Sequence, residues 1–200
     1  MDQLTKEQIK ALVRIEGKSP SWFGNFDLFV KGFGTSIEVS IALGVVRDVN
    51  NLSDRTVQTI NEIANLTEED YKHILRLLFD DAMVFKEECC SNESTPKPPP
   101  ANWWRRIFTR DQFVELAADD PRHPLFGITS PEDIPKRIKW DGFYIDDAQE
   151  TQERIAFLTC HPPWDVEHGR EVAICNGVPV EVNPIELNPY FYSDQIEDAP

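Results

Sequence analysis

The chain has 200 residues, of which 40% are hydrophobic and 28% charged, so it holds enough apolar side chains for a core and is not globally disordered. Its 35 acidic residues outnumber 20 basic ones and leave a formal net charge of -15. This balance argues against nucleic acid as a partner, because Lys and Arg are needed to displace phosphate counterions. A basic protein partner would instead be attracted, although solubility alone is the simpler use of the charge.

The start of the chain, "MDQLTKEQIKALVRIEGK", is charged and helix-prone and lacks the apolar segment of a signal peptide. The sequence contains no run of 18 apolar residues, so we expect no membrane partner. Its four cysteines, without an export signal, are typical of reduced thiols, and we expect the adjacent Cys89 and Cys90 to be free. The sequence therefore predicts a cytoplasmic protein.

The N-terminal part predicts a short helix and then a β-hairpin. Residues 5–15 are helix-prone, and "GKSPSW" ends that pattern. Apolar residues then alternate on both sides of a turn at Gly32 and Gly34, which predicts a hairpin with one buried face. The alternating residues are Phe26, Leu28, Val30, Ile37, Val39 and Ile41.

Residues 53–88 have a helical period instead. Ser53 can cap a first helix, and Thr67 followed by Asp70 resembles the capping box of a second helix. The second helix has an apolar stripe wide enough to lie across a sheet. The stripe consists of Tyr71, Ile74, Leu75, Leu78, Ala82 and Phe85. One continuous helix bent near Leu66 is the alternative.

Residues 89–101, "CCSNESTPKPPPA", have the composition of a linker, because the prolines at 96 and 98–100 forbid helix and favour polyproline conformation. A short helix is predicted around residues 110–118, within a proline-punctuated path. We interpret residues 91–137 as an insertion within a single domain that spans residues 1–200.

The last third of the chain returns to strands. The predicted strands are 141–147, 154–160, 170–175 and 178–182. Asn176-Gly177 tolerates the positive φ angles of a tight type I′ hairpin between the last two. The element order predicts an α+β domain. Its antiparallel β-sheet combines the N-terminal hairpin with a C-terminal meander, and its helices pack on one face.

The stretch from His161 to Gly169, "HPPWDVEHG", concentrates side chains that could carry chemistry. In a catalytic interpretation, His168 is a general base oriented by Asp165 or Glu167. A metal site would recruit His161 and His168 with Cys160 or Cys175. The spacings match no zinc, metalloprotease or nucleophile motif, so we expect no catalytic residue, metal or cofactor.

We favour a structural corner between two strands for the same residues. In this interpretation Trp164 packs on the sheet, and Asp165 accepts hydrogen bonds from backbone N–H groups two or three residues ahead. Glu167 or His168 ties the loop to a neighbouring strand. Gly169 supplies a positive φ before the next strand. Asp80 and Asp81, on the predicted helix, are expected on its solvated face.

Two regions are candidates for binding a protein partner. The first, in "WWRRIFTR", combines the residue types that anchor interfaces: Trp103, Trp104, Arg105 and Arg106. The alternative is that both Trp side chains fasten the insertion to the core and the Arg side chains pair with carboxylates. The second is an acidic surface around the strand "GFYI", formed by Asp141, Asp146 and Asp147, for which turn chemistry is the alternative.

The segment "FLTCHPPWDVEHGREVAICNGVPVEV" resembles the C-terminal signature of a bacterial family of unknown function. That signature has a strand, then C-x-W-D-x-E-H-G, then a strand hairpin. The matching residues are Cys160, Trp164, Asp165, Glu167, His168 and Gly169, followed by Asn176-Gly177, Val180 and Val182. Residues 91–137 and 161–163 depart from the family pattern. The resemblance carries over no established enzymatic activity, and related small acidic α+β proteins are often suggested to be immunity proteins.

Three functional hypotheses follow. The leading one is a non-enzymatic cytoplasmic immunity protein that inhibits a cognate toxin by occlusion, with its acidic surface steered onto a basic active-site cleft. The second is a small hydrolase-type enzyme that uses His168 with Asp165 or Glu167. The third is a scaffold or regulatory module in which the insertion at residues 91–137 grips a partner.

Overall fold

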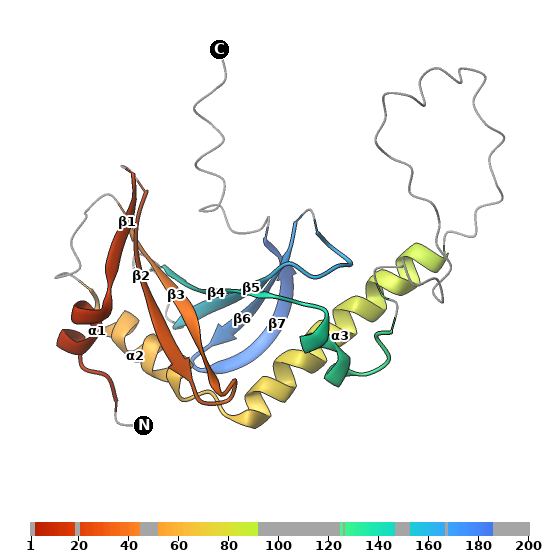
Figure 1. Ribbon diagram of the computed structural model, residues 1–200, viewed down its shortest axis with the longest axis horizontal. Helices are drawn as coiled ribbons and strands as arrows, with labels where there is room; N and C mark the ends of the chain where they lie inside the picture. The colour runs from red at the N-terminus through yellow and green to blue at the C-terminus, as the bar shows by residue number, and fades with distance from the viewer. Residues whose placement is uncertain are drawn as a thin grey trace, which may run out of the picture.

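The computed structural model describes residues 3–18, 21–44, 52–91, 125, 127–146, 153–166 and 168–185. The helices in these ranges are α1 (Lys6–Leu12), α2 (Asp54–Ala64), α3 (Glu68–Ser91) and the 3-10 helix η3 (Pro131–Lys136). The strands are β1 (Arg14–Lys18), β2 (Ser21–Val30), β3 (Thr35–Gly44), β4 (Trp140–Asp146), β5 (Ile155–Cys160), β6 (Arg170–Cys175) and β7 (Val178–Pro184). They form one sheet in chain order, and α2 and α3 lie along one of its faces (Figure 1).

The α+β class is confirmed, with a sheet that is mostly antiparallel. Within the described chain β3 and β4 are the parallel neighbours, with Val39 beside Phe143 and Ile41 beside Ile145. Parallel strands need a crossover connection, and here the chain between them includes α2 and α3. The N-terminal hairpin and the C-terminal meander are therefore joined by a crossover, which the expectation of an antiparallel sheet did not include.

The N-terminal helix is shorter than the predicted range of residues 5–15. Thr5 caps α1: its hydroxyl accepts from the backbone N of Gln8, and the Gln8 side chain accepts from the backbone N of Thr5. The chain leaves the helix at Val13 and forms β1, a strand that the sequence analysis missed. Only one large apolar residue, Ile15, lies in β1, so its period-2 pattern is weak.

The predicted hairpin is confirmed as β2 and β3. Phe26 pairs with Val39 and Leu28 with Ile37, and all four side chains are buried. The turn at Gly32 lies against the start of α3. A Cβ atom at residue 32 would be 2.2 Å from a backbone oxygen of that segment, so only glycine fits this close approach.

Two separate helices follow, so the alternative of one bent helix is wrong. The Ser53 hydroxyl accepts from the backbone N of Thr56 and begins α2. The predicted capping box begins α3: the Thr67 hydroxyl accepts from the Asp70 N, and the Asp70 carboxylate accepts from the Thr67 N. The stripe of α3 packs in the core, with Ile74, Leu75, Leu78 and Ala82 buried and Tyr71 and Phe85 half-buried.

The linker prediction is wrong for residues 89–91, because α3 continues to Ser91. The side chains of Cys89 and Cys90, residues 92–101 and the predicted helix around 110–118 lie outside the described structure. Further along, η3 packs against α3, and Ile128 and Ile134 are buried in the core. The C-terminal part of the 91–137 segment therefore contributes to the same core as the sheet.

The core lies between the sheet and the helices. At one register level the facing side chains form a buried row across the strands: Phe26, Val39, Phe143, Leu158 and Val172. Burying one such side chain contributes about 1.5–3 kcal/mol. We call the opposite side of the sheet the outer face. The alternate residues of each strand point to it, and none of the described helices packs there.

Candidate functional site

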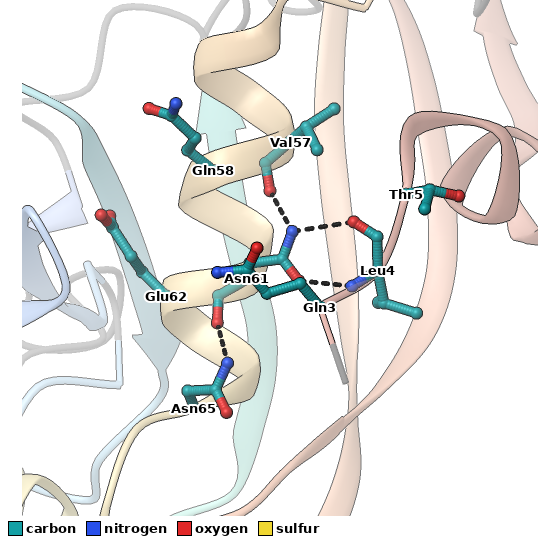
Figure 2. A pocket seen from close by; sticks show the side chains of 8 residues that line it. All are labelled: Gln3, Leu4, Thr5, Val57, Gln58, Asn61, Glu62 and Asn65. Carbon is teal, nitrogen blue, oxygen red and sulfur yellow. Dashed lines mark hydrogen bonds between the residues drawn. The ribbon is translucent and has the colours of Figure 1, made fainter. Parts of the chain in front are cut away.

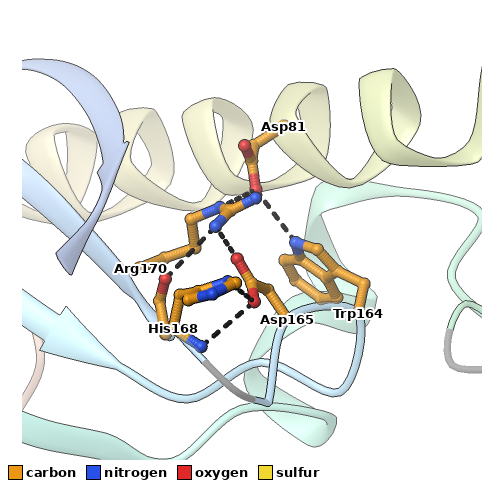
Figure 3. A network of polar contacts seen from close by, with 6 residues as sticks. Asp81, Trp164, Asp165, His168 and Arg170 are labelled. Atoms are coloured by element: carbon orange, nitrogen blue, oxygen red, sulfur yellow. Dashed lines mark hydrogen bonds and ion pairs between the residues drawn. The ribbon is translucent and has the colours of Figure 1, made fainter. Parts of the chain in front are cut away.

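The corner at residues 161–169 connects β5 to β6, and Asp165 is its central polar residue (Figure 3). The predicted backbone hydrogen bond is present: the His168 N donates to Asp165 Oδ1 at 3.2 Å. The same oxygen lies 3.0 Å from His168 Nδ1. The other carboxylate oxygen accepts from Arg170 Nη1. Both oxygens of Asp165 are therefore engaged within the corner.

A second carboxylate, Asp81 on α3, ties the corner to the helix. Its Oδ2 accepts from Trp164 Nε1 and from Arg170 Nε, both at 2.9 Å. Trp164 is 2% exposed and belongs to the hydrophobic core. Because a buried indole N–H and a mostly buried guanidinium both need an acceptor, Asp81 stabilises the position of the whole corner.

Sequence analysis missed Arg170 and assigned Asp81 to a solvated helix face, which is wrong. The side chain of Asp81 is 21% exposed, whereas its neighbour Asp80 is exposed as expected. Asp81 follows Ile74 by seven residues and Leu78 by three, so the helical period places it on the core-facing side. That spacing was the available signal for a buried partner of the corner.

Gly169 has φ +72, the positive value that the corner interpretation expected. Its surroundings are also closed. A Cβ atom at this position would be 2.7 Å from Ile185 Cδ1 and 3.0 Å from the carbonyl oxygen of Cys160. Both the backbone conformation and the space therefore require glycine where the corner enters β6.

A separate carboxylate–imidazole pair lies at the start of the corner. His161 Nδ1 is 2.7 Å from Asp141 Oδ2, with the two side chains 52% and 40% exposed. Asp141, a candidate for partner binding, is thus exposed but paired. Asp146 ends β4 and is half-buried. The other candidates lie outside the described residues: Trp103, Trp104, Arg105, Arg106, Asp147 and, in the corner, Glu167.

A groove of about 570 Å³ lies between residues 3–5, the N-terminal arm, and α2 (Figure 2). Asn61 holds the arm by its main chain: its Oδ1 accepts from the Leu4 N at 2.7 Å, and its Nδ2 donates to the Leu4 carbonyl at 2.9 Å. Glu62 also lines the groove, but its carboxylate accepts from Arg154 Nε at 2.9 Å. These side chains fasten α2 to its neighbours, and sequence patterns predicted none of the contacts.

The most perturbed carboxyl group on the outer face is that of Glu171 on β6. It is 3% exposed, and its Oε2 has no hydrogen-bond donor in the described part of the chain. Burial raises the pKa of Glu171 to about 7. In the sequence Glu171 looks like an ordinary outward-facing residue of an alternating strand, so no local pattern singles it out.

Comparison with known families assigns the chain to a family. The family model of a domain of unknown function, DUF6985, matches residues 12–189. The chain belongs to the DUF6985 family. The match covers every described strand, both long helices and the corner, and the predicted resemblance to a family of unknown function is confirmed. No curated protein and no solved structure matches the chain.

The cysteines of this DUF6985 domain are poorly suited to nucleophilic chemistry where they are described. Cys160 is buried, and burial with the nearby carboxylates of Asp141 and Asp81 raises its pKa to about 12. Burial also raises the pKa of Cys175. Both are free thiols. In the described ranges no three His, Cys, Asp or Glu side chains are grouped to hold a metal, and no helix is long and apolar enough to span a membrane.

Proposed function

We propose that this DUF6985 protein is a non-enzymatic cytoplasmic binding protein that inhibits a basic partner by covering it, as an immunity protein covers a toxin. The observation that carries the proposal is the charge of -15 over 200 residues. Such a charge accelerates association with a basic surface and disfavours acidic partners. The bacterial origin and the immunity role are part of the proposal.

The state of the corner supports binding rather than catalysis. Asp165 is occupied by Arg170 and by the backbone of His168, and Asp81 is occupied by Trp164 and Arg170. A general base needs an orienting group, but it also needs room for a substrate beside it. The groups of the corner instead satisfy one another and fix the chain between β5 and β6.

The test is co-production with the protein encoded beside this gene. We expect restored cell viability and a complex on size-exclusion chromatography that weakens as salt rises from about 50 to about 500 mM. The variant His168→Ala should protect as well as the wild type, because occlusion does not use its imidazole. Absence of both rescue and complex would contradict the proposal.

A hydrolase-type enzyme is the second candidate, favoured by one observation. His168 lies 3.0 Å from Asp165 with 44% of its side chain exposed, so it has an oriented imidazole open to solvent. In that case His168→Ala would abolish protection while the complex still forms. The same variant thus separates the two candidates.

A further inference from the structure

Carboxylates outnumber cations on the outer face of the sheet. Strand register places the following acidic residues there: Glu16, Asp27, Glu38, Asp146, Glu171 and Glu181. In the described strands the same register places two basic residues on this face, Arg14 and Lys18, and Arg14 Nη2 lies 3.8 Å from Glu38 Oε2. A surface with this excess of one sign attracts a basic partner, and it repels a second copy of the same acidic chain.

Glu171 lies among these acids and differs from them in burial. It is 3% exposed, and it points to the outer face because Val172 and Ile174 of the same strand pack in the core. Its cross-strand neighbours are Thr159 on β5 and Asn183 on β7. The Thr159 hydroxyl donates to the Gly142 carbonyl at 3.1 Å, and the Asn183 amide donates to Glu181 at 3.1 Å. Both neighbours therefore use a side-chain donor elsewhere, and Glu171 Oε2 has no donor in the described part of the chain.

The side chains between the carboxylates are apolar, and they are largely buried: Tyr144 and Ala173 are each 4% exposed. The rings of Phe23 and Tyr144 pack with centroids 6.4 Å apart, and Phe157 and Ala173 continue this apolar layer next to Glu171. An apolar floor beside a carboxylate suits the side chains of lysine and arginine, whose aliphatic stems pack on apolar surface while the charged head reaches an acceptor. The outer face thus has apolar side chains for the stem beside a carboxylate for the charge.

We propose that the outer face docks the basic partner and that a lysine or arginine side chain of the partner pairs with the carboxylate of Glu171. This inference rests on the proposed function and specifies its surface. The exposed carboxylates steer the approach but add little affinity individually. Glu171 is the anchor, because a buried carboxylate with an oxygen that lacks a donor gains most from an incoming cation. Its Oε2 is buried in the free chain, so binding requires a rearrangement around Glu171.

A small cation tests the anchor directly. Butylammonium carries the stem and the head of a lysine side chain and can be titrated into the ¹⁵N-labelled full chain, with sodium chloride at equal ionic strength as the reference. We expect saturable amide shifts at Glu171, Thr159 and Asn183. Glu171→Gln should weaken this binding about tenfold, whereas Asp27→Asn, an exposed acid on the same face, should change it less than about twofold.

Shifts spread evenly over the surface, or equal affinity in Glu171→Gln and the wild type, would overturn the proposal. If Glu171→Gln does not fold, the shift map of the wild type decides alone, since shifts centred away from Glu171 also overturn it. The complex from co-production separates this inference from the function. If the complex forms and Glu171→Gln does not weaken it, the outer face is rejected as the docking surface and the proposed function stands. If no complex forms but butylammonium gives specific shifts, the proposed function is rejected and the cation site stands.

Discussion

The corner and the outer face both hold buried or partly buried carboxylates, but these carboxylates differ in their hydrogen-bond partners. In the corner, Asp165 and Asp81 share Arg170, and each also accepts a further N–H group. On the outer face, Glu171 is more deeply buried and its Oε2 accepts nothing from the described residues. Paired acids stabilise the fold and are not free to act. An unpaired buried acid is a cost to the fold, and a partner can remove that cost.

Asp81→Ala should give the largest effect, because it leaves the Arg170 guanidinium and the Trp164 N–H without their shared acceptor. We expect the free energy of unfolding to fall by about 3–4 kcal/mol, measured by urea denaturation. Asp80→Ala is the matched control, since Asp80 is adjacent and exposed, and it should cost less than about 0.5 kcal/mol. Equal losses in both variants would mean that the corner does not depend on the helix.

Glu171→Gln should stabilise the fold at neutral pH, in contrast to Asp81→Ala, and the size of the gain should depend on pH. The pKa of Glu171 is raised from its ordinary value of 4.5 to about 7, so the unfolded chain ionises at a lower pH than the folded one. The wild type therefore loses stability relative to the variant as pH rises from about 4.5 to about 7, by up to about 3 kcal/mol in total. Urea unfolding of both chains between about pH 4 and pH 8 measures this difference.

The exposed Glu181→Gln controls for the loss of one charge from the same face. A difference between wild type and Glu171→Gln that is constant across this pH range would show that the buried carboxyl is not perturbed. The contrast between corner and outer face would then disappear.

Gly169→Ala tests whether the corner is as tightly constrained as its hydrogen bonds suggest. Residue 169 combines φ +72 with a Cβ position 2.7 Å from Ile185, so we expect a loss of about 2 kcal/mol in thermal or urea unfolding. Gly34→Ala separates the two causes. Gly34 has φ +63 but open space around it, so its variant should lose only about 1 kcal/mol. A loss no greater at residue 169 than at residue 34 would show that the corner yields to the added methyl group.

Sequence patterns predicted the local parts of this molecule and missed the parts that depend on distant residues. The hairpin, the stripe of α3 and the Asn176-Gly177 turn, with φ 50 and 80, follow from spacings of a few residues. The parallel pairing of β3 with β4 joins segments about 100 residues apart, and no local period encodes it. The same limit applies to the site. Asp165 and Gly169 act within one turn, whereas Asp81 and Arg170 are 89 residues apart. The burial of Glu171 could not be predicted from the strand pattern, because the burial of an outward-facing residue depends on the residues packed around it.

His168→Ala should have the smallest effect on stability, and it best distinguishes the binding interpretation from the catalytic one. The imidazole lies on the rim of the corner with 44% of its side chain exposed, and Asp165 keeps its bond to Arg170 without it. We therefore expect a loss of less than about 1 kcal/mol in urea unfolding. His161→Ala is the matched control, because His161 forms a similar exposed pair with Asp141 at 2.7 Å. If His168→Ala kept its stability and its complex but lost all protection, while His161→Ala kept protection, the imidazole would act on a substrate. The corner would then be the functional region and the outer face only an acidic surface.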